Sequence, residues 1–165
     1  MRVVADTGPL NYLILIREID ILPALFRVIV VPEEVAAELG HPDAPPAVRT
    51  RIQEPPSWLR VETCPGQDVP HLARLDIGER AAVLLACATG ADLLLMDDRA
   101  GVPAARASGL SVTGTLGLLD LAARRGLVDL ELALQKLRAT SFRCRPALLD
   151  AVLERHRSET GEGAP

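Results

Sequence analysis

Aromatic residues are scarce in this chain of 165 residues, because Phe, Trp and Tyr together make up 2% of it. The hydrophobic core must therefore be aliphatic, and a broad surface that stacks the bases of single-stranded nucleic acid on aromatic rings is disfavoured. The chain also lacks a long uninterrupted apolar run. Its N-terminal apolar segment, VVADTGPLNYLILI, is interrupted by Asp6 and Pro9, so we expect neither a signal peptide nor a membrane span.

Cysteine and histidine are also few and widely separated. Neither recurs at the short spacing that a zinc site or a disulfide framework needs, and the six positions are Cys64, Cys87, Cys144, His41, His71 and His156. The simplest interpretation is a protein of the reducing cytoplasm, with no membrane partner.

Positive charge is limited and unevenly placed. The net charge of −4 argues against a general nucleic-acid binder. Residues 1–98 carry 15 acidic and 8 basic side chains, whereas residues 99–165 carry 7 acidic and 10 basic side chains. This asymmetry is compatible with an acidic site beside a basic rim.

The pattern of apolar residues predicts strands that alternate with helices. The predicted strands are residues 2–5, 27–31, 58–62, 92–96 and 110–115, and the predicted helices are residues 9–17, 20–26, 32–40, 47–53, 76–90, 99–109, 116–126, 127–140 and 145–157. Such alternation indicates an α/β fold with a mainly parallel sheet. The length favours a single domain, residues 1–157, followed by a frayed tail at residues 158–165.

Carboxylates follow two of the predicted strands. Asp6 lies at the carboxyl end of the first strand, and Asp97 and Asp98 lie at the carboxyl end of the strand LLLM. Open α/β sheets bind their ligands at the carboxyl ends of the strands. Each also has a structural explanation, because Asp6 and one of the paired aspartates could cap the helix that follows. Capping leaves the second aspartate of the pair unexplained. Adjacent carboxylates raise each other's pKa unless a cation compensates their charge.

Two glutamates on predicted helices extend this set. Glu38 lies late in its helix, where a negative charge opposes the helix dipole, so a role in local stability is disfavoured; a solvated surface glutamate is the alternative. Glu79 follows Asp76 at the spacing of a capping box, which explains it without any function. A carboxylate at a helix start can also bind a metal ion.

The chemistry of the set points to a hard cation. With no histidine or cysteine in it, an all-oxygen site suits Mg²⁺ or Mn²⁺, and several carboxylates can hold two such ions as a clamp for phosphoryl displacement. Metal-dependent phosphodiester hydrolysis is therefore predicted. A receiver-like domain is disfavoured because the only lysine, Lys136, lies within a predicted helix, and a haloacid-dehalogenase-type phosphatase because Gly8 stands where a second aspartate is needed.

Four segments in order resemble the PIN domain, the nuclease fold of VapC-type toxins. They are VADTGPLNYL, VPEEVAAEL, LDIGERAAVLLA and LLLMDDRAG, and the later VTGTLGLLDLAARRGLV resembles a prokaryotic PIN-like subgroup. The resemblance implies a three-layer α/β/α sandwich, an acidic pocket for Mg²⁺ or Mn²⁺, and an endoribonuclease that cleaves single-stranded RNA. It also implies a homodimer and a cognate antitoxin protein. The alternative is a PIN-like RNA- or protein-binding module with weak or no catalysis.

The resemblance assigns site residues by position. The family's acidic quartet corresponds to Asp6, Glu38, Glu79 and Asp98, and the auxiliary candidates are Asp97 as a further ligand, Thr7, Asn11, Arg99, Thr113 and Thr115. Met96 stands where the family often has a hydroxyl, which Thr113 or Thr115 could supply. Glu79 stands where the family often has aspartate, so Asp76 competes as the third ligand. Candidate phosphate contacts are Arg99, Arg106, Arg124, Arg125, Arg143 and Arg145.

Overall fold

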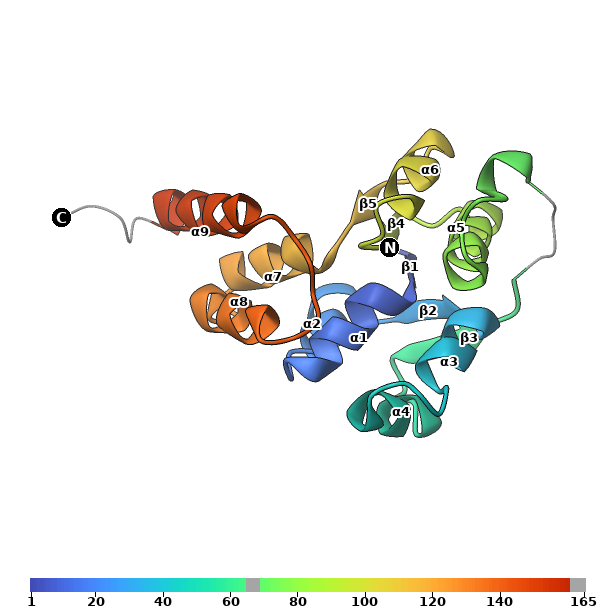
Figure 1. Ribbon diagram of the computed structural model, residues 1–165, viewed down its shortest axis with the longest axis horizontal. Coiled ribbons are helices and arrows are strands. Elements are labelled where there is room, and N and C mark those ends of the chain that lie inside the picture. The colour runs from blue at the N-terminus through green and yellow to red at the C-terminus, as the bar shows by residue number, and fades with distance from the viewer. Residues whose placement is uncertain (65–68, 161–165) are drawn as a thin grey trace.

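A parallel five-stranded sheet forms the centre of the computed structural model, which describes residues 1–64 and 69–160 (Figure 1). The strands are β1 (Val3–Ala5), β2 (Ile29–Pro32), β3 (Leu59–Glu62), β4 (Leu93–Leu95) and β5 (Val112–Thr113). Their order across the sheet is β3-β2-β1-β4-β5, and every neighbouring pair is parallel. The predicted α/β class with a mainly parallel sheet is confirmed.

Helices connect the strands, at or near the positions that the sequence predicts. They are α1 (Thr7–Leu15), α2 (Ile21–Phe26), α3 (Glu33–Leu39), α4 (Pro46–Gln53), the 3₁₀ helix η1 (Pro70–Leu72), α5 (Ile77–Thr89), α6 (Gly101–Ala107), α7 (Thr115–Arg124), α8 (Leu130–Arg138) and α9 (Pro146–Thr160). The ends of α5 show why the boundaries lie where they do. Asp76 caps its start, and Gly90 follows its end with a left-handed φ of 60°.

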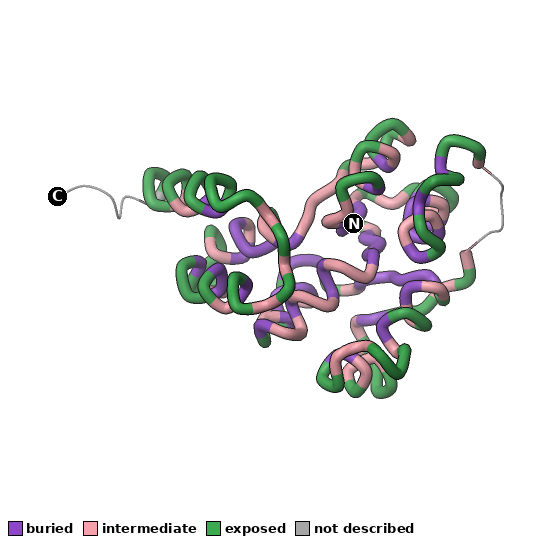
Figure 2. The backbone as a smooth tube through the Cα atoms, in the orientation of Figure 1, coloured by how far each residue is buried: buried purple, intermediate pink, exposed green. Residues whose placement is uncertain are grey.

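Side chains of β1, β2 and β4 alternate between two hydrophobic cores, one on each face of the sheet. In β1, Val3 and Ala5 face a core shared with α1, α2, α7 and α8, whereas Val4 faces a second core shared with α5 and α6. Figure 2 shows β1, β2 and the inner faces of these helices as the buried part of the chain. Two helical layers therefore enclose the sheet, which confirms the predicted three-layer sandwich.

Strand β1 is the switch point of the sheet, because later strands are added on both of its sides. Strands β2 and β3 are added on one side of β1, and β4 and β5 on the other. The Asp6 N–H donates to the Leu95 carbonyl at 2.9 Å, so the carboxyl ends of β1 and β4 are joined. Such a switch point is where open α/β sheets bind their ligands. It is also where Asp6 and the Asp97–Asp98 pair meet.

The C-terminal region differs in detail from the prediction. The strand predicted at residues 110–115 is only Val112–Thr113, because Thr115 already begins α7. Helix α9 includes residues 158–160, which were predicted as tail, and residues 161–165 of that tail lie outside the described residues. Within residues 1–64 and 69–160, no helix combines the length and apolar content needed to cross a membrane.

Candidate active site

Asp6 is the most deeply buried carboxylate at the switch point, with 5% of its surface exposed. It lies between β1 and α1 as the N-cap residue, but its side chain makes no capping hydrogen bond. Burial, reinforced by the negative charges of Glu38 and Asp76, raises the pKa of Asp6 to about 7, although the backbone N–H groups of Thr7 and Gly8 partly oppose the shift. Asp6 therefore occupies a position that favours a nearby positive charge.

Glu38 approaches this position from α3. Its Oε2 accepts a hydrogen bond of 2.8 Å from the Thr7 hydroxyl, which ties the side chain to the start of α1. The same oxygen lies 2.8 Å from the point that a Cβ would occupy on Gly78, in the first turn of α5. A glycine at this position thus gives the Glu38 carboxylate room to lie between α1 and α5.

Asp76 and Glu79 form the predicted capping box at the start of α5. Asp76 accepts from the Glu79 N–H at 2.8 Å, and the Glu79 side chain reaches back to the Asp76 N–H at 3.3 Å. Burial raises the pKa of Glu79 to about 7, with further contributions from the negative charges of Asp76, Asp98 and Asp6. Both residues therefore combine a structural role with a place beside the other acids.

Asp98 is held by the backbone at the start of α6. One of its oxygens accepts from the N–H groups of Ala100 at 2.6 Å and Gly101 at 2.8 Å. Burial opposes its charge, but these two bonds and a hydrogen bond with the Glu79 side chain outweigh burial and lower the pKa of Asp98. The Glu79 side chain thus favours the ionised form of Asp98.

Asp97 has a different set of partners, although it adjoins Asp98. Its two oxygens accept from Thr115, one from the backbone N–H at 2.7 Å and the other from the hydroxyl at 2.5 Å. Gly8 and Gly114 both approach the carboxylate closely, so a side chain on either would meet it. Burial raises the pKa of Asp97, and the two bonds from Thr115 oppose that shift. Asp97 therefore joins the end of β4 to the start of α7.

The remaining predicted residues are spread around these acids. Asn11 lies one helical turn after Thr7 on α1 and is half-buried, while Arg99 is exposed beside Asp98. The Thr113 hydroxyl lies close to Gly117 of α7. Met96 is 1% exposed and packs in the core beneath α5 and α6, against Gly101. The Thr115 hydroxyl binds Asp97, so it does not stand in at Asp98 for the hydroxyl that Met96 replaces.

The carboxylates of Asp6, Glu38, Asp76, Glu79 and Asp98 influence one another electrostatically, and they form one acidic site. Across the described parts of the chain, however, no three acidic, histidine or cysteine side chains are arranged to hold a metal ion. Glu38 is turned to Thr7, Glu79 to its own helix start and Asp98 to the backbone. Rotation of these flexible side chains would be needed for them to share a ligand.

The chemistry of the site nevertheless fits a divalent cation. All donors are carboxylate oxygens, which Mg²⁺ and Mn²⁺ prefer. Two of the carboxyls, Asp6 and Glu79, have pKa values raised to about 7, as expected where buried negative charge is uncompensated. A cation bound there would lower both values and keep both groups ionised.

Two features of the site were not foreseen from the sequence. Gly78 makes room for Glu38, and the only signal for it was a small residue between Asp76 and Glu79 in the first turn of a helix. Thr113 and Thr115 were alternative sources of the hydroxyl missing at Met96, and the double hydrogen bond from Thr115 to Asp97 was not foreseen. The sequence signal for the contact with Asp97 was the Gly114–Thr115 pair after a short strand, because a glycine lets a carboxylate approach the backbone closely.

A comparison with protein-family models supports this picture of the chain. The model of the family DUF3368, described as a PIN domain, matches residues 2–158. Comparisons with curated proteins and with solved structures gave no match.

Proposed function

We propose, because the chain belongs to the PIN-domain family DUF3368, that it is a divalent-metal-dependent endoribonuclease that cleaves single-stranded RNA. PIN domains are typically nucleases and generally use divalent metal ions. The observation that carries the proposal is the burial of Asp6 at the switch point of the sheet, with the Glu38, Glu79 and Asp98 carboxylates around it. Asp6 makes no capping hydrogen bond, so helix capping does not account for a buried carboxylate at this position.

The proposed ligands of Mg²⁺ or Mn²⁺ are Asp6, Glu38, Glu79 and Asp98, with Asp76 as an alternative third donor. A bound divalent ion supplies an activated water and stabilises the charge of the leaving oxygen in phosphodiester hydrolysis. Asp97 is less suited to direct binding, because Thr115 occupies both of its oxygens.

The surrounding residues position these acids. Thr7 orients Glu38 through its hydroxyl, and the N–H groups of Ala100 and Gly101 fix Asp98. In the metal-free site the pKa of Glu79 is raised to about 7. A bound cation would favour the ionised form of this carboxyl, which is the form that binds metal.

The biological setting is proposed from the same family membership. We propose that the protein is the toxin of a type II toxin–antitoxin pair in the cytoplasm, where it acts as a homodimer and is inhibited by a cognate antitoxin. Co-expression with the product of a neighbouring small reading frame would test this setting. Growth arrest by the protein alone, relieved by that partner, is the expected result, and arrest by the Asp6→Asn variant would contradict it.

A second candidate is a PIN-like module that binds RNA or a protein with weak or no catalysis. Two observations favour it: Met96 is buried in the core at the position where the family often has a hydroxyl, and no three ligands converge among the described residues. The two candidates differ in whether the protein needs the carboxylates of the acidic site to cleave RNA, or binds its partner without using them for catalysis.

Cleavage of an unstructured, end-labelled RNA separates the candidates. The nuclease proposal expects cleavage with Mn²⁺ or Mg²⁺, no cleavage with a chelator, and loss of cleavage in Asp6→Asn. The matched control is Asp43→Asn, which removes an exposed carboxylate on the loop after α3. Cleavage that survives in Asp6→Asn would reject the assigned site, and no cleavage by the native protein with either metal would favour the binding module.

A further inference from the structure

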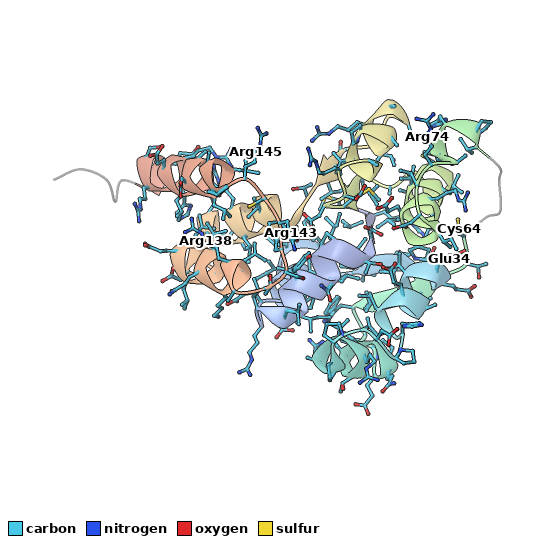
Figure 3. The ribbon with its side chains drawn as sticks, viewed as in Figure 1. Glu34, Cys64, Arg74, Arg138, Arg143 and Arg145 are labelled. Carbon is cyan, nitrogen blue, oxygen red and sulfur yellow. The ribbon has the colours of Figure 1, made fainter. Side chains whose placement is uncertain are left out.

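The arginines of the C-terminal region divide into two groups. Most are paired with acids: Arg124 and Arg155 with Asp120, Arg138 with Asp150, and Arg157 with Glu131. Arg143 and Arg145 are exposed and form no ion pair with any residue in the described parts of the chain. Arg125, at the end of α7, is likewise exposed and without an ion pair in the described parts of the chain. Arg143 and Arg145 both belong to one short segment, residues 141–145, in the connection between α8 and α9 (Figure 3).

This connecting segment is fixed to the body of the protein. Its residues alternate in exposure, with Phe142 and Cys144 packed against the larger core and Arg143 and Arg145 outside. The Phe142 ring meets the Tyr12 ring edge-on, with 4.9 Å between their centroids. The Phe142 N–H also donates to the Thr140 hydroxyl at 3.1 Å. The two guanidinium groups therefore extend from an anchored segment, which reduces the entropy lost when they bind a ligand.

The segment also lies close to the acidic site. Tyr12 is one helical turn after Gly8 on α1, and Gly8 adjoins Asp97. Since Phe142 contacts Tyr12, the segment packs on the same helix, α1, whose first turn adjoins the acids. The connecting segment passes beside α1 in Figure 1.

We propose that Arg143 and Arg145 bind backbone phosphates of the RNA next to the phosphate that is cleaved, an inference that rests on the proposed function. Guanidinium groups bind phosphate with two parallel hydrogen bonds. In an extended segment, side chains two residues apart are separated by about 6.6 Å, which is comparable to the separation of neighbouring phosphates in a single strand.

RNA suits this surface better than an acidic protein segment does. The metal-free acidic site repels any anion. Once metal is bound, the cation attracts the phosphates of a phosphodiester chain, which is the proposed substrate. Such a chain needs positively charged groups outside the site to contribute affinity, because the carboxylates of the site repel the scissile phosphate. The scarcity of aromatic residues leaves the backbone, rather than stacked bases, as the main source of affinity.

The test is the salt dependence of RNA binding, measured by fluorescence anisotropy with a labelled, unstructured RNA. All variants carry Asp6→Asn, so that binding is measured without cleavage. The pair Arg143→Gln/Arg145→Gln is compared with Arg27→Gln/Arg60→Gln, which removes the same charge from exposed arginines at the end of α2 and on β3. Each single-strand phosphate contact contributes about 0.7 to the slope of log K against log salt, so two contacts contribute about 1.4.

The proposal expects the Arg143/Arg145 variant to lose about 1.4 from this slope. Over a roughly fourfold rise in salt, the parent would then lose about sevenfold more affinity than that variant. The Arg27/Arg60 control should keep the parent's slope. An unchanged slope in the Arg143/Arg145 variant, an equal loss in the control, or no RNA binding by any protein would overturn the proposal.

Cleavage by the chain with Asp6 intact is scored separately, so the two proposals can fail independently. Cleavage with an unchanged slope leaves the nuclease and rejects the phosphate contacts. No cleavage with a reduced slope rejects the nuclease and keeps the contacts. Loss of binding to an acidic peptide, with RNA binding intact, would assign Arg143 and Arg145 to a protein partner and overturn the proposal.

Discussion

Replacing Asp6 by asparagine should stabilise the metal-free protein at alkaline pH, although it removes the central acid of the proposed site. The pKa of Asp6 is raised from 3.8 to about 7 in the folded protein. Between these values the folded state holds a proton that the unfolded state has lost, so the free energy of unfolding falls as the pH rises. Asparagine is neutral and of similar shape, and it avoids this loss.

The size of the effect follows from the shift. About three pKa units correspond to about 4 kcal/mol, because one unit is worth about 1.4 kcal/mol. This value is an upper bound, since side-chain rotation and water entry would relieve part of the burial. Below pH 4 the Asp6 carboxyl is protonated in both states, and the native protein and Asp6→Asn should have similar stability. Above pH 7 the full difference should be present.

Urea unfolding followed by circular dichroism, with a chelator present, measures the difference. We expect Asp6→Asn to have the higher free energy of unfolding at pH 8 and a value close to that of the native protein at pH 4. The exposed Asp43→Asn variant controls for loss of charge alone. Adding Mg²⁺ or Mn²⁺ at pH 8 should stabilise the native protein more than Asp6→Asn. An Asp6→Asn protein that is no more stable than the native one at pH 8 would refute the reasoning.

Two other changes test contacts of the acidic site, and a third tests the ion pairs that Asp120 forms with Arg124 and Arg155. Thr115→Val removes a hydroxyl from the buried Asp97 carboxylate and should lower the free energy of unfolding by about 1–3 kcal/mol in urea, whereas Thr115→Ser should cost less. Gly78→Ala adds a Cβ 2.8 Å from Glu38 Oε2. It should reduce RNA cleavage while changing the free energy of unfolding by less than about 1 kcal/mol, and unchanged cleavage would show that Glu38 can move without consequence. Asp120→Asn weakens the ion pairs with Arg124 and Arg155, at 3.2 and 2.9 Å. It should cost about 2 kcal/mol and make thermal unfolding less sensitive to added salt; an unchanged melting temperature would contradict this.

The alternation of strands and helices was predictable from the sequence because the strands are short, apolar and β-branched, and because clear signals punctuate the helices. The Asp76–Glu79 capping box and Gly90 located α5 nearly to the residue. The start of α7 was not predictable in the same way. Thr115 has a side chain common in strands, and its helical conformation is supported by bonds to Asp97, which lies far away in the sequence.

The sequence suggested a set of acids, but it did not indicate the hydrogen-bond partners of each one. Strand ends and the family resemblance suggested Asp6, Glu38, Glu79 and Asp98, and the electrostatic coupling among these residues agrees with a shared location. The separate role of Asp97 could not be predicted, because adjacent residues in a loop can point to different partners. Which of two neighbouring carboxylates turns inward depends on Gly8 and Gly114, two close approaches that only the packed structure reveals.

The pairing of β1 with β4 has a consequence for synthesis on the ribosome. The first strand to emerge is the central one, and it reaches β2 early, but its other neighbour belongs to a much later part of the chain. The acidic centre therefore cannot assemble until β4 and the start of α7 have left the exit tunnel and docked. Chains that terminate before the start of α7 at Thr115 would lack a complete site, so any nuclease activity requires synthesis at least to that point.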